Sequence, residues 1–150
     1  MVRLRSRKKI GVILFLFVML VSVTACGQNE NENGTMVLTI NGENVFVEWE
    51  DNESVRALKE LVLAEPLSIQ MSMYGGFEQV GSIGTNLPRN DVQTTTEAGD
   101  IVLYSGNQIV IFYGSNSWAY TKLGKVIDKS KDKMTELLGN GAITITISME

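Results

Sequence analysis

Alternating apolar and polar positions predict a first β-hairpin where the folded part of the chain begins. In MVLTI (residues 36–40), Leu38 and Ile40 alternate with Val37 and Thr39, and ENVFVEW (residues 43–49) continues the same period of two. A period of two is typical of strands with one buried face. The Asn-Gly pair between the two runs favours a tight turn, because both residue types tolerate positive φ.

A second hairpin is predicted from LSIQMSMY (residues 67–74) and FEQVGSI (residues 77–83), with two glycines between them. The stretch that follows, GTNLPRNDVQTTTEA (residues 84–98), is polar and rich in turn-forming residues. We therefore expect a long surface loop there, rather than a strand or helix. Long ordered loops often carry functional residues.

Three further strand-like runs lie close together between residues 99 and 127. They are IVLY (101–104), QIVIFY (108–113) and AYTKLGKVI (119–127), separated by a Ser-Gly-Asn turn and by a loop over residues 114–118. This stretch also holds most of the aromatic residues of the domain, and its centre is almost continuously apolar. It predicts one wall of a barrel. A last strand is predicted over residues 143–148, where isoleucines alternate with Thr and Ser.

Two short helices complete the pattern. In DNESVRALKELVLAEP (residues 51–66), apolar residues recur at helical spacing, Asp51 or Asn52 can cap the start, and Pro66 closes the segment. The second helix is predicted over Lys131 to Leu138, before a Gly-Asn-Gly stop. Eight strands and two helices indicate a mainly β fold: a closed eight-stranded barrel capped by two short helices, since closure removes exposed sheet edges.

The N-terminus predicts export and lipid attachment. A basic segment (residues 3–9) precedes an apolar run (residues 10–23) and then the lone Cys26. Val23 to Cys26 resembles a bacterial lipobox, which implies cleavage before Cys26 and acylation of that residue. We expect a signal peptide over 1–25, a flexible tether over 26–35, a barrel domain over 36–150, and a location on the extracytoplasmic face of the cell membrane. The alternative is an uncleaved membrane anchor with an incidental cysteine, although the apolar run is short for one.

Composition excludes several classes of function. The whole chain has 13 basic and 17 acidic residues, and loss of the signal peptide leaves 8 basic residues and a net charge of −9, which argues against nucleic acid as a partner. There is no histidine and only one cysteine. Histidine-based triads, zinc sites and internal disulfides are therefore excluded, and we expect no metal and no cofactor.

Four aromatic residues surround one connection in the predicted wall: Phe112, Tyr113, Trp118 and Tyr120. They can form a binding surface for an apolar or proline-containing ligand. The structural alternative places Phe112 in the core and Trp118 over one end of the barrel. Arg89, in the predicted loop, is either a clamp for an anion or carbonyl group or a solvated surface charge.

In its order of elements and in several sequence segments, the chain resembles the bacterial cyclophilin-like domain family. The resemblance extends over about residues 36–149, and the segments that carry it are NGENVFVEWEDNESVRALKEL, PLSIQMSMYGGFEQVGSIGTNLP, EAGDIVLYSGNQIVIFYGSNSWAYTKLGKVID and GAITITI. It implies a capped eight-stranded barrel related to cyclophilin, in agreement with the order of elements. It does not by itself imply a reaction.

The resemblance also suggests where a groove would lie. Cyclophilins are prolyl isomerases with a Phe-His-Arg run followed by Pro-Gly-Phe. The best counterpart of Pro-Gly-Phe here is Gly75-Gly76-Phe77, which puts Ser72 in place of the catalytic arginine. Serine cannot supply the cation that stabilises the twisted prolyl amide. The groove would be lined by Met71, Met73, Phe77, Arg89, Phe112, Tyr113, Trp118 and Tyr120.

Two hypotheses follow. The first is a membrane-tethered, non-catalytic module that binds an extended peptide or a small apolar ligand, with no catalytic residue. The second is a peptidyl-prolyl cis-trans isomerase that acts on exported proteins. The second hypothesis requires a cation in the groove, and Arg89 is the residue that could supply it.

Overall fold

The structure, a computed structural model, describes residues 34–150. The predicted signal peptide, Cys26 and most of the predicted tether lie outside the described residues. Thr35, the last residue of that tether, exchanges two backbone hydrogen bonds with Glu150, at 2.8 and 2.9 Å. This pair extends the ladder between the first and last strands by one step.

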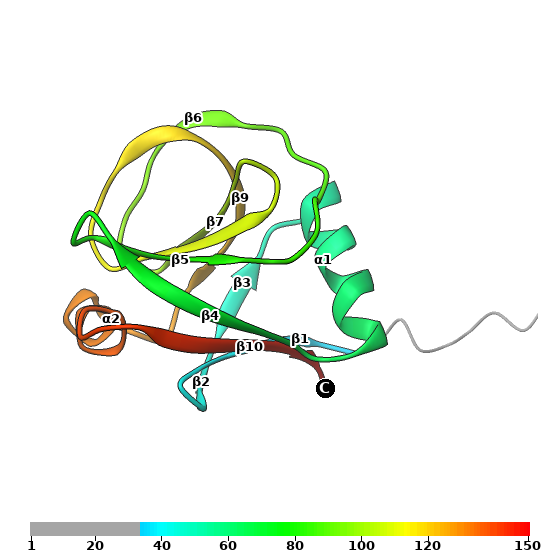
Figure 1. The fold of residues 1–150 in the computed structure, drawn as a ribbon, viewed down its shortest axis with the longest axis horizontal. Helices are drawn as coiled ribbons and strands as arrows, with labels where there is room; N and C mark the ends of the chain where they lie inside the picture. The colour runs from blue at the N-terminus through cyan, green and yellow to red at the C-terminus, as the bar shows by residue number, and fades with distance from the viewer. Residues whose placement is uncertain (1–33) are drawn as a thin grey trace, which may run out of the picture. The chain divides into compact units, whose positions relative to one another are not determined.

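The described residues form a nearly closed antiparallel β-barrel with two helices (Figure 1). Nine strands follow one another around the sheet in the order β2-β1-β10-β4-β5-β8-β7-β9-β3, and β6 pairs with β9 off this path. The strands are β1 (Met36–Ile40), β2 (Glu43–Val45), β3 (Val47–Trp49), β4 (Leu67–Tyr74), β5 (Glu78–Ser82), β6 (Val92–Thr95), β7 (Asp100–Tyr104), β8 (Gln108–Phe112), β9 (Ser117–Val126) and β10 (Ile143–Met149).

The prediction of eight strands is wrong by one along this path, because the run 43–49 is broken at Phe46. The Phe46 amide donates to Asp128 Oδ1 (3.0 Å), and its carbonyl accepts from the Ile127 amide (2.9 Å). These contacts take Phe46 out of both ladders. β2 then pairs with β1 while β3 pairs with β9, so the two halves of one predicted strand lie at opposite ends of the sheet order.

The polar stretch 84–98 contains a strand, β6. Within it, β6 pairs antiparallel with the first residues of β9, from Val92 opposite Tyr120 to Thr95 opposite Ser117. The prediction of a loop without a strand is therefore wrong at this point. The same pairing begins β9 at Ser117, so Trp118 lies in a strand rather than in the predicted loop.

The predicted turns and helix starts are confirmed. Asn41 and Gly42 have φ values of 48° and 82°, the geometry of a tight hairpin turn. Helix α1 (Glu53–Ala64) is capped by Asn52, whose side chain accepts from the Val55 amide (2.9 Å). Helix α2 (Lys131–Leu138) is capped by Ser130 in the same way. Within residues 34–150, neither helix has the length and apolar character needed to cross a membrane.

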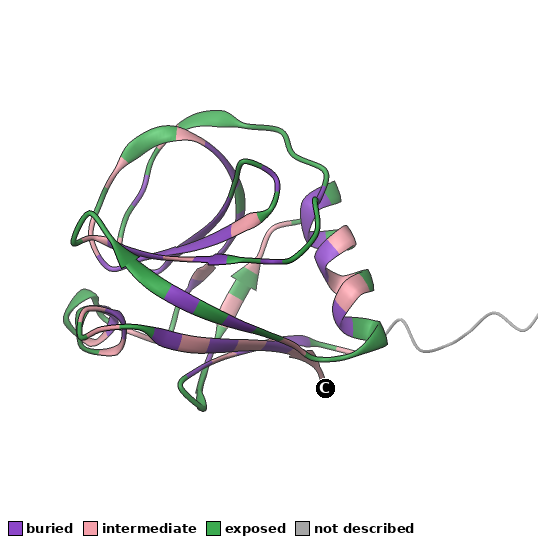
Figure 2. Cartoon of the chain, in the orientation of Figure 1, coloured by how far each residue is buried: buried purple, intermediate pink, exposed green. Residues whose placement is uncertain are grey.

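Both helices bury their apolar sides against the barrel. Leu58 and Val62 of α1 and Met134 and Leu138 of α2 are all buried in the main core. Figure 1 shows α1 and α2 on opposite sides of the barrel, and in Figure 2 the buried positions of α1 are those turned toward the strands. The helices thus pack on the main core, and no residue of α1 or α2 belongs to a second, smaller core on one wall of the barrel.

That wall, made by β5, β8, β7 and β9, has two apolar faces. Its inner face adds Ile101, Leu103, Ile109 and Ile111 to the main core. Its outer face carries a second, smaller core of Val102, Val110, Phe112 and Tyr120, against which Phe77 and Val80 pack. Burial on both faces explains why the sequence of β8 is almost continuously apolar.

Candidate functional site

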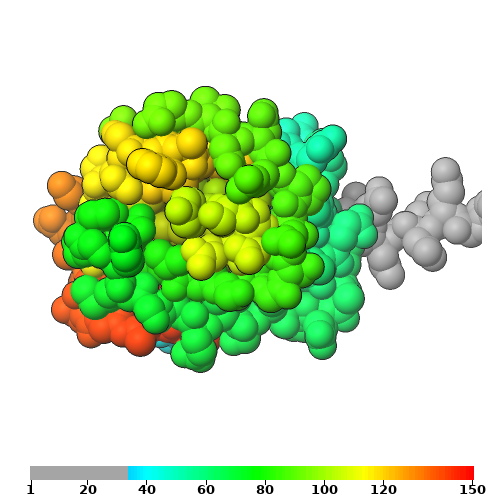
Figure 3. All heavy atoms as spheres, turned by 45° about the horizontal axis from the view of Figure 1, so that its top comes forward, coloured from blue at the N-terminus to red at the C-terminus, as the bar shows by residue number. Residues whose placement is uncertain are grey.

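A pocket of about 550 Å³ lies on the outer face of this wall, next to the smaller core. Its lining comes from β4, β5, β7, β8, β9 and the loop before β9. Figure 3 shows the tip of the β4–β5 hairpin, the β7–β8 segment and the start of β9 next to one another on one face of the domain. The lining residues are Tyr74, Glu78, Val80, Tyr104, Gln108, Val110, Asn116, Trp118 and Tyr120.

Strand register places these side chains together. Val110 of β8 lies between Val80 of β5 and Val102 of β7, while Gln108 lies opposite Tyr104 one step along. Because side chains alternate between the faces of a strand, residues two apart on each strand line the same pocket. The pocket is therefore a product of pairing between strands distant in sequence.

Aromatic contacts fix the floor of the pocket. The Tyr120 ring meets Phe112 edge-to-face, with centroids 5.7 Å apart, and meets Tyr104 in the same manner at 6.2 Å. The Tyr120 hydroxyl accepts a hydrogen bond from Asn116 Nδ2 (2.9 Å). Burial raises the pKa of Tyr120, against the opposing effect of this hydrogen bond. The phenol thus stays neutral, and its ring is held in place from two sides.

The loop carrying Asn116 is anchored by the fully buried Thr96. The Thr96 hydroxyl accepts from the Asn116 amide and donates to the Asn116 carbonyl, both at 3.0 Å, and the Thr96 amide donates to the same carbonyl (2.8 Å). Three hydrogen bonds to one loop residue give the pocket a preformed edge. Preformed edges lower the entropic cost of binding.

Glu78 is the ionisable residue with the most perturbed environment in the pocket. It is 94% buried, and its Oε2 atom has no hydrogen-bond partner. Burial in these surroundings raises the pKa of its carboxyl group from 4.5 to about 7. Among the described residues that line the pocket, none is lysine or arginine, so nothing there compensates the charged form. A carboxyl group in this state can exchange a proton near neutral pH or accept a cation.

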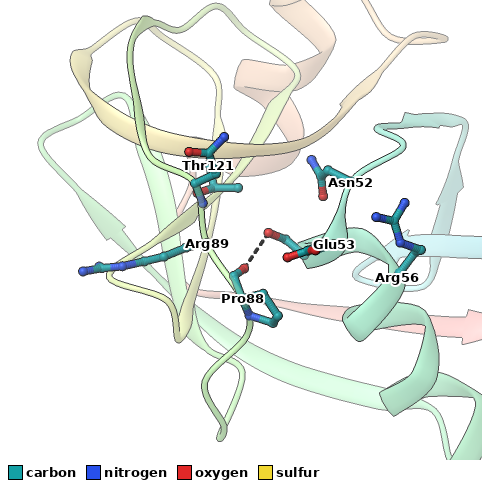
Figure 4. Close-up of a pocket in the computed structure, with 8 residues that line it drawn as sticks. Asn52, Glu53, Arg56, Pro88, Arg89 and Thr121 are labelled. Atoms are coloured by element: carbon teal, nitrogen blue, oxygen red, sulfur yellow. Dashed lines mark hydrogen bonds between the residues drawn. The ribbon is translucent and has the colours of Figure 1, made fainter.

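A second pocket, of about 410 Å³, lies between the start of α1 and the segment before β6. Ser54 Oγ bridges it by donating to the Pro88 carbonyl (2.5 Å). Arg56 is paired with Asp51 at 2.7 Å, and Arg89 with Asp91 at 3.6 Å. Figure 4 shows the Arg89 side chain extending away from α1 and from Arg56. The two guanidinium groups do not converge on one point.

The structure brings only part of the predicted groove together. Trp118 and Tyr120 line the aromatic pocket. Phe112 and Phe77 lie in or against the small core next to it, and Phe112 is completely buried. Four residues lie elsewhere: Met71 and Tyr113 in the main core, Met73 exposed on β4, and Arg89 in the second pocket.

Sequence reasoning did not identify Tyr74, Glu78, Tyr104 or Asn116 as part of a site. Tyr74 and Tyr104 are each the last residue of a strand, and their outward direction follows from alternation within β4 and β7. For Glu78, the sequence indicates less clearly than for the two tyrosines that the residue belongs to the pocket. It is a carboxyl group two residues before Val80, on the face that register places beside Val110.

Metal binding has no support within residues 34–150, where no group of three or more metal-ligating side chains occurs. The pocket therefore offers three kinds of interaction: aromatic faces, a few hydrogen-bonding groups, and one partly charged carboxyl group. Such a lining is typical of a site for a small organic molecule.

The comparisons agree with this fold. The sequence matches the model of the Cyclophilin-like family over residues 38–148. A search of curated proteins found no match.

Among solved structures, that of McbB in complex with tryptophan is similar at 15% identity, over 76% of this chain and 44% of that chain, with a TM-score of 0.56. This chain thus spans less than half of the McbB chain. The hypothetical protein AF2241 from Archaeoglobus fulgidus is similar at 16% identity, over 80% of this chain and 99% of that one, with a TM-score of 0.52. At these identities the likeness shows the fold alone.

Proposed function

Because the chain belongs to the cyclophilin-like family, we propose that its barrel is a non-catalytic module that binds a small apolar ligand at the extracytoplasmic face of the cell membrane. The observation that carries the proposal is the preformed pocket lined by Trp118, Tyr120, Tyr104 and Tyr74. Its volume of about 550 Å³ lies within the range of small-molecule sites. A small ligand therefore fits it better than a long extended peptide does.

The isomerase hypothesis gains no support from the placement of its residues. Ser72, the counterpart of the catalytic arginine, is an exposed residue of β4. Arg89 lines the second pocket and not the aromatic one. None of the described residues that line the aromatic pocket is lysine or arginine, so this lining lacks the group that would stabilise a twisted prolyl amide. Binding without catalysis is the function that the geometry favours.

Trp118→Ala is expected to weaken binding of a simple aromatic probe, 2-phenylethanol, by about tenfold, because Trp118 presents an exposed ring to the pocket. The measurement is an NMR titration that follows pocket resonances. Phe46→Ala is the matched control, since Phe46 is also an exposed aromatic residue but does not line the pocket, and this variant should bind as the parent does. Absence of a saturable shift with any apolar probe at millimolar concentration would refute the proposal.

The tether is a separate part of the proposal. It is supported by the lipobox-like residues before Cys26 and by an apolar run too short for a typical membrane-spanning helix. Cys26→Ala is expected to block maturation and acylation, so that the slower-migrating precursor accumulates. Gln28→Ala, two residues away, should mature normally. A Cys26→Ala protein that is still cleaved and still fractionates with membranes would contradict the lipid anchor.

A further inference from the structure

The pocket contains an acid with no partner, and this points to the charge of its ligand. Glu78 is 94% buried, and its Oε2 atom accepts no hydrogen bond. Buried polar groups in native proteins are nearly always paired, so an orphaned oxygen at a pocket wall requires an explanation. Oε2 itself is almost completely shielded, but Glu78 lines the pocket, so a positively charged donor seated against its carboxyl group would compensate the buried oxygen.

The surroundings of Glu78 favour a positively charged donor. The other side chains with an ionisable group that line the pocket are the phenols of Tyr74 on β4, Tyr104 on β7 and Tyr120 on β9, none of which is a base. On β8, Gln108 and Val110 carry no charge, and Glu78 itself lies directly opposite Phe112. Of the residues in 34–150 that line the pocket, none has a basic side chain that could pair with the carboxylate, and aromatic faces attract cations through their ring quadrupoles.

We infer that the pocket binds a small primary amine in its protonated form, with the ammonium group at Glu78 and an aromatic or apolar body against Tyr74, Tyr104 and Trp118. This inference rests on the proposed function and refines it: the small ligand keeps a largely apolar body and carries one charged amino group. Only the ionised carboxylate can form the ion pair. The raised pKa of Glu78, near 7, therefore couples amine binding to release of one proton from the protein.

Three probes with the same phenyl body test the inference by calorimetry on the full chain: 2-phenylethylamine, 2-phenylethanol and 3-phenylpropionate. At pH 8 we expect the amine to bind at least tenfold more tightly than the alcohol, and the carboxylate to bind most weakly. Amine affinity should fall by about 30-fold between pH 8 and pH 5.5, as Glu78 is protonated. The affinity for the alcohol should change little with pH.

Glu78→Gln keeps the shape of the side chain and removes its charge. In this variant the amine should lose its advantage and its pH dependence, while the alcohol binds within twofold of the parent. Glu136→Gln, a matched change at the exposed Glu136 of α2, should leave all three affinities unchanged.

The outcomes separate the two proposals. If the alcohol binds as tightly as the amine, or if Glu78→Gln retains the amine preference, the inference fails and the proposed function stands. If the carboxylate binds best, the inference also fails. If none of the three probes binds, the proposed function itself is contradicted.

Discussion

Replacing Phe112 by alanine is expected to lower the free energy of unfolding by about 3–5 kcal/mol, the range for a fully buried aromatic side chain. Phe112 is completely buried, and it packs edge-to-face against Tyr120 at 5.7 Å. Truncation leaves a cavity in the four-residue core beneath the pocket, where few other side chains can move in to fill it. We therefore expect Phe112→Ala to lose binding through loss of folded protein.

Urea unfolding followed by circular dichroism measures this effect. Phe46→Ala makes the same chemical change at a residue that is 73% exposed, and it should shift stability by no more than about 0.5 kcal/mol. Equal midpoints for the two variants would show that the outer face of the wall is not a packed core. The comparison also explains why Trp118, and not Phe112, is the residue to alter when binding is measured.

Glu78→Gln is expected to stabilise the protein at pH 8 by about 2 kcal/mol and to have little effect at pH 4. The pKa of Glu78 is about 7 in the folded protein, against 4.5 for an unperturbed carboxyl group. Between these values the folded state binds more protons than the unfolded state, so stability falls as pH rises through this window. The full difference corresponds to about 3 kcal/mol, which we reduce because water in the open pocket screens the charge.

The measurement is urea unfolding of parent and variant at both pH values. Glutamine carries no charge, so the free energy of unfolding of the variant should not show the decrease between pH 4.5 and pH 7 that the parent shows. Glu136→Gln is again the control, since it removes an exposed carboxylate with only a surface partner, Lys133. A stabilisation of equal size at pH 4 and pH 8 would mean that packing, and not ionisation of Glu78, is responsible.

Local sequence pattern was sufficient for most elements of the fold. The alternation in β1 and β10, the Asn41-Gly42 turn and the capped start of α1 all arise from interactions within a few residues. The break at Phe46 does not arise from local interactions, because it is caused by a hydrogen bond to Asp128, 82 residues away. β6 was missed for a related reason. Its residues are mostly polar and exposed, and only pairing with β9 makes them a strand.

The site was predictable only in the part that is local in sequence. Trp118 and Tyr120 were identified because they lie two residues apart in an aromatic-rich run. Glu78 could not be assigned in this way, since a single carboxyl group in a strand is usually solvated. Its environment depends on a wall that packs apolar side chains on both faces, which is a property of the assembled sheet.

The position of β10 in the sheet determines when folding can be completed. This strand lies between β1 and β4, with Met149 opposite Met36 and Ile143 opposite Met71. Until residues 143–149 are available, β1 and β4 have no partner between them, and the barrel cannot form as the chain is synthesised. Pairings of such long sequence separation also make folding slow. Any machinery that moves this chain before its last strand emerges therefore handles a chain whose sheet is still open between β1 and β4.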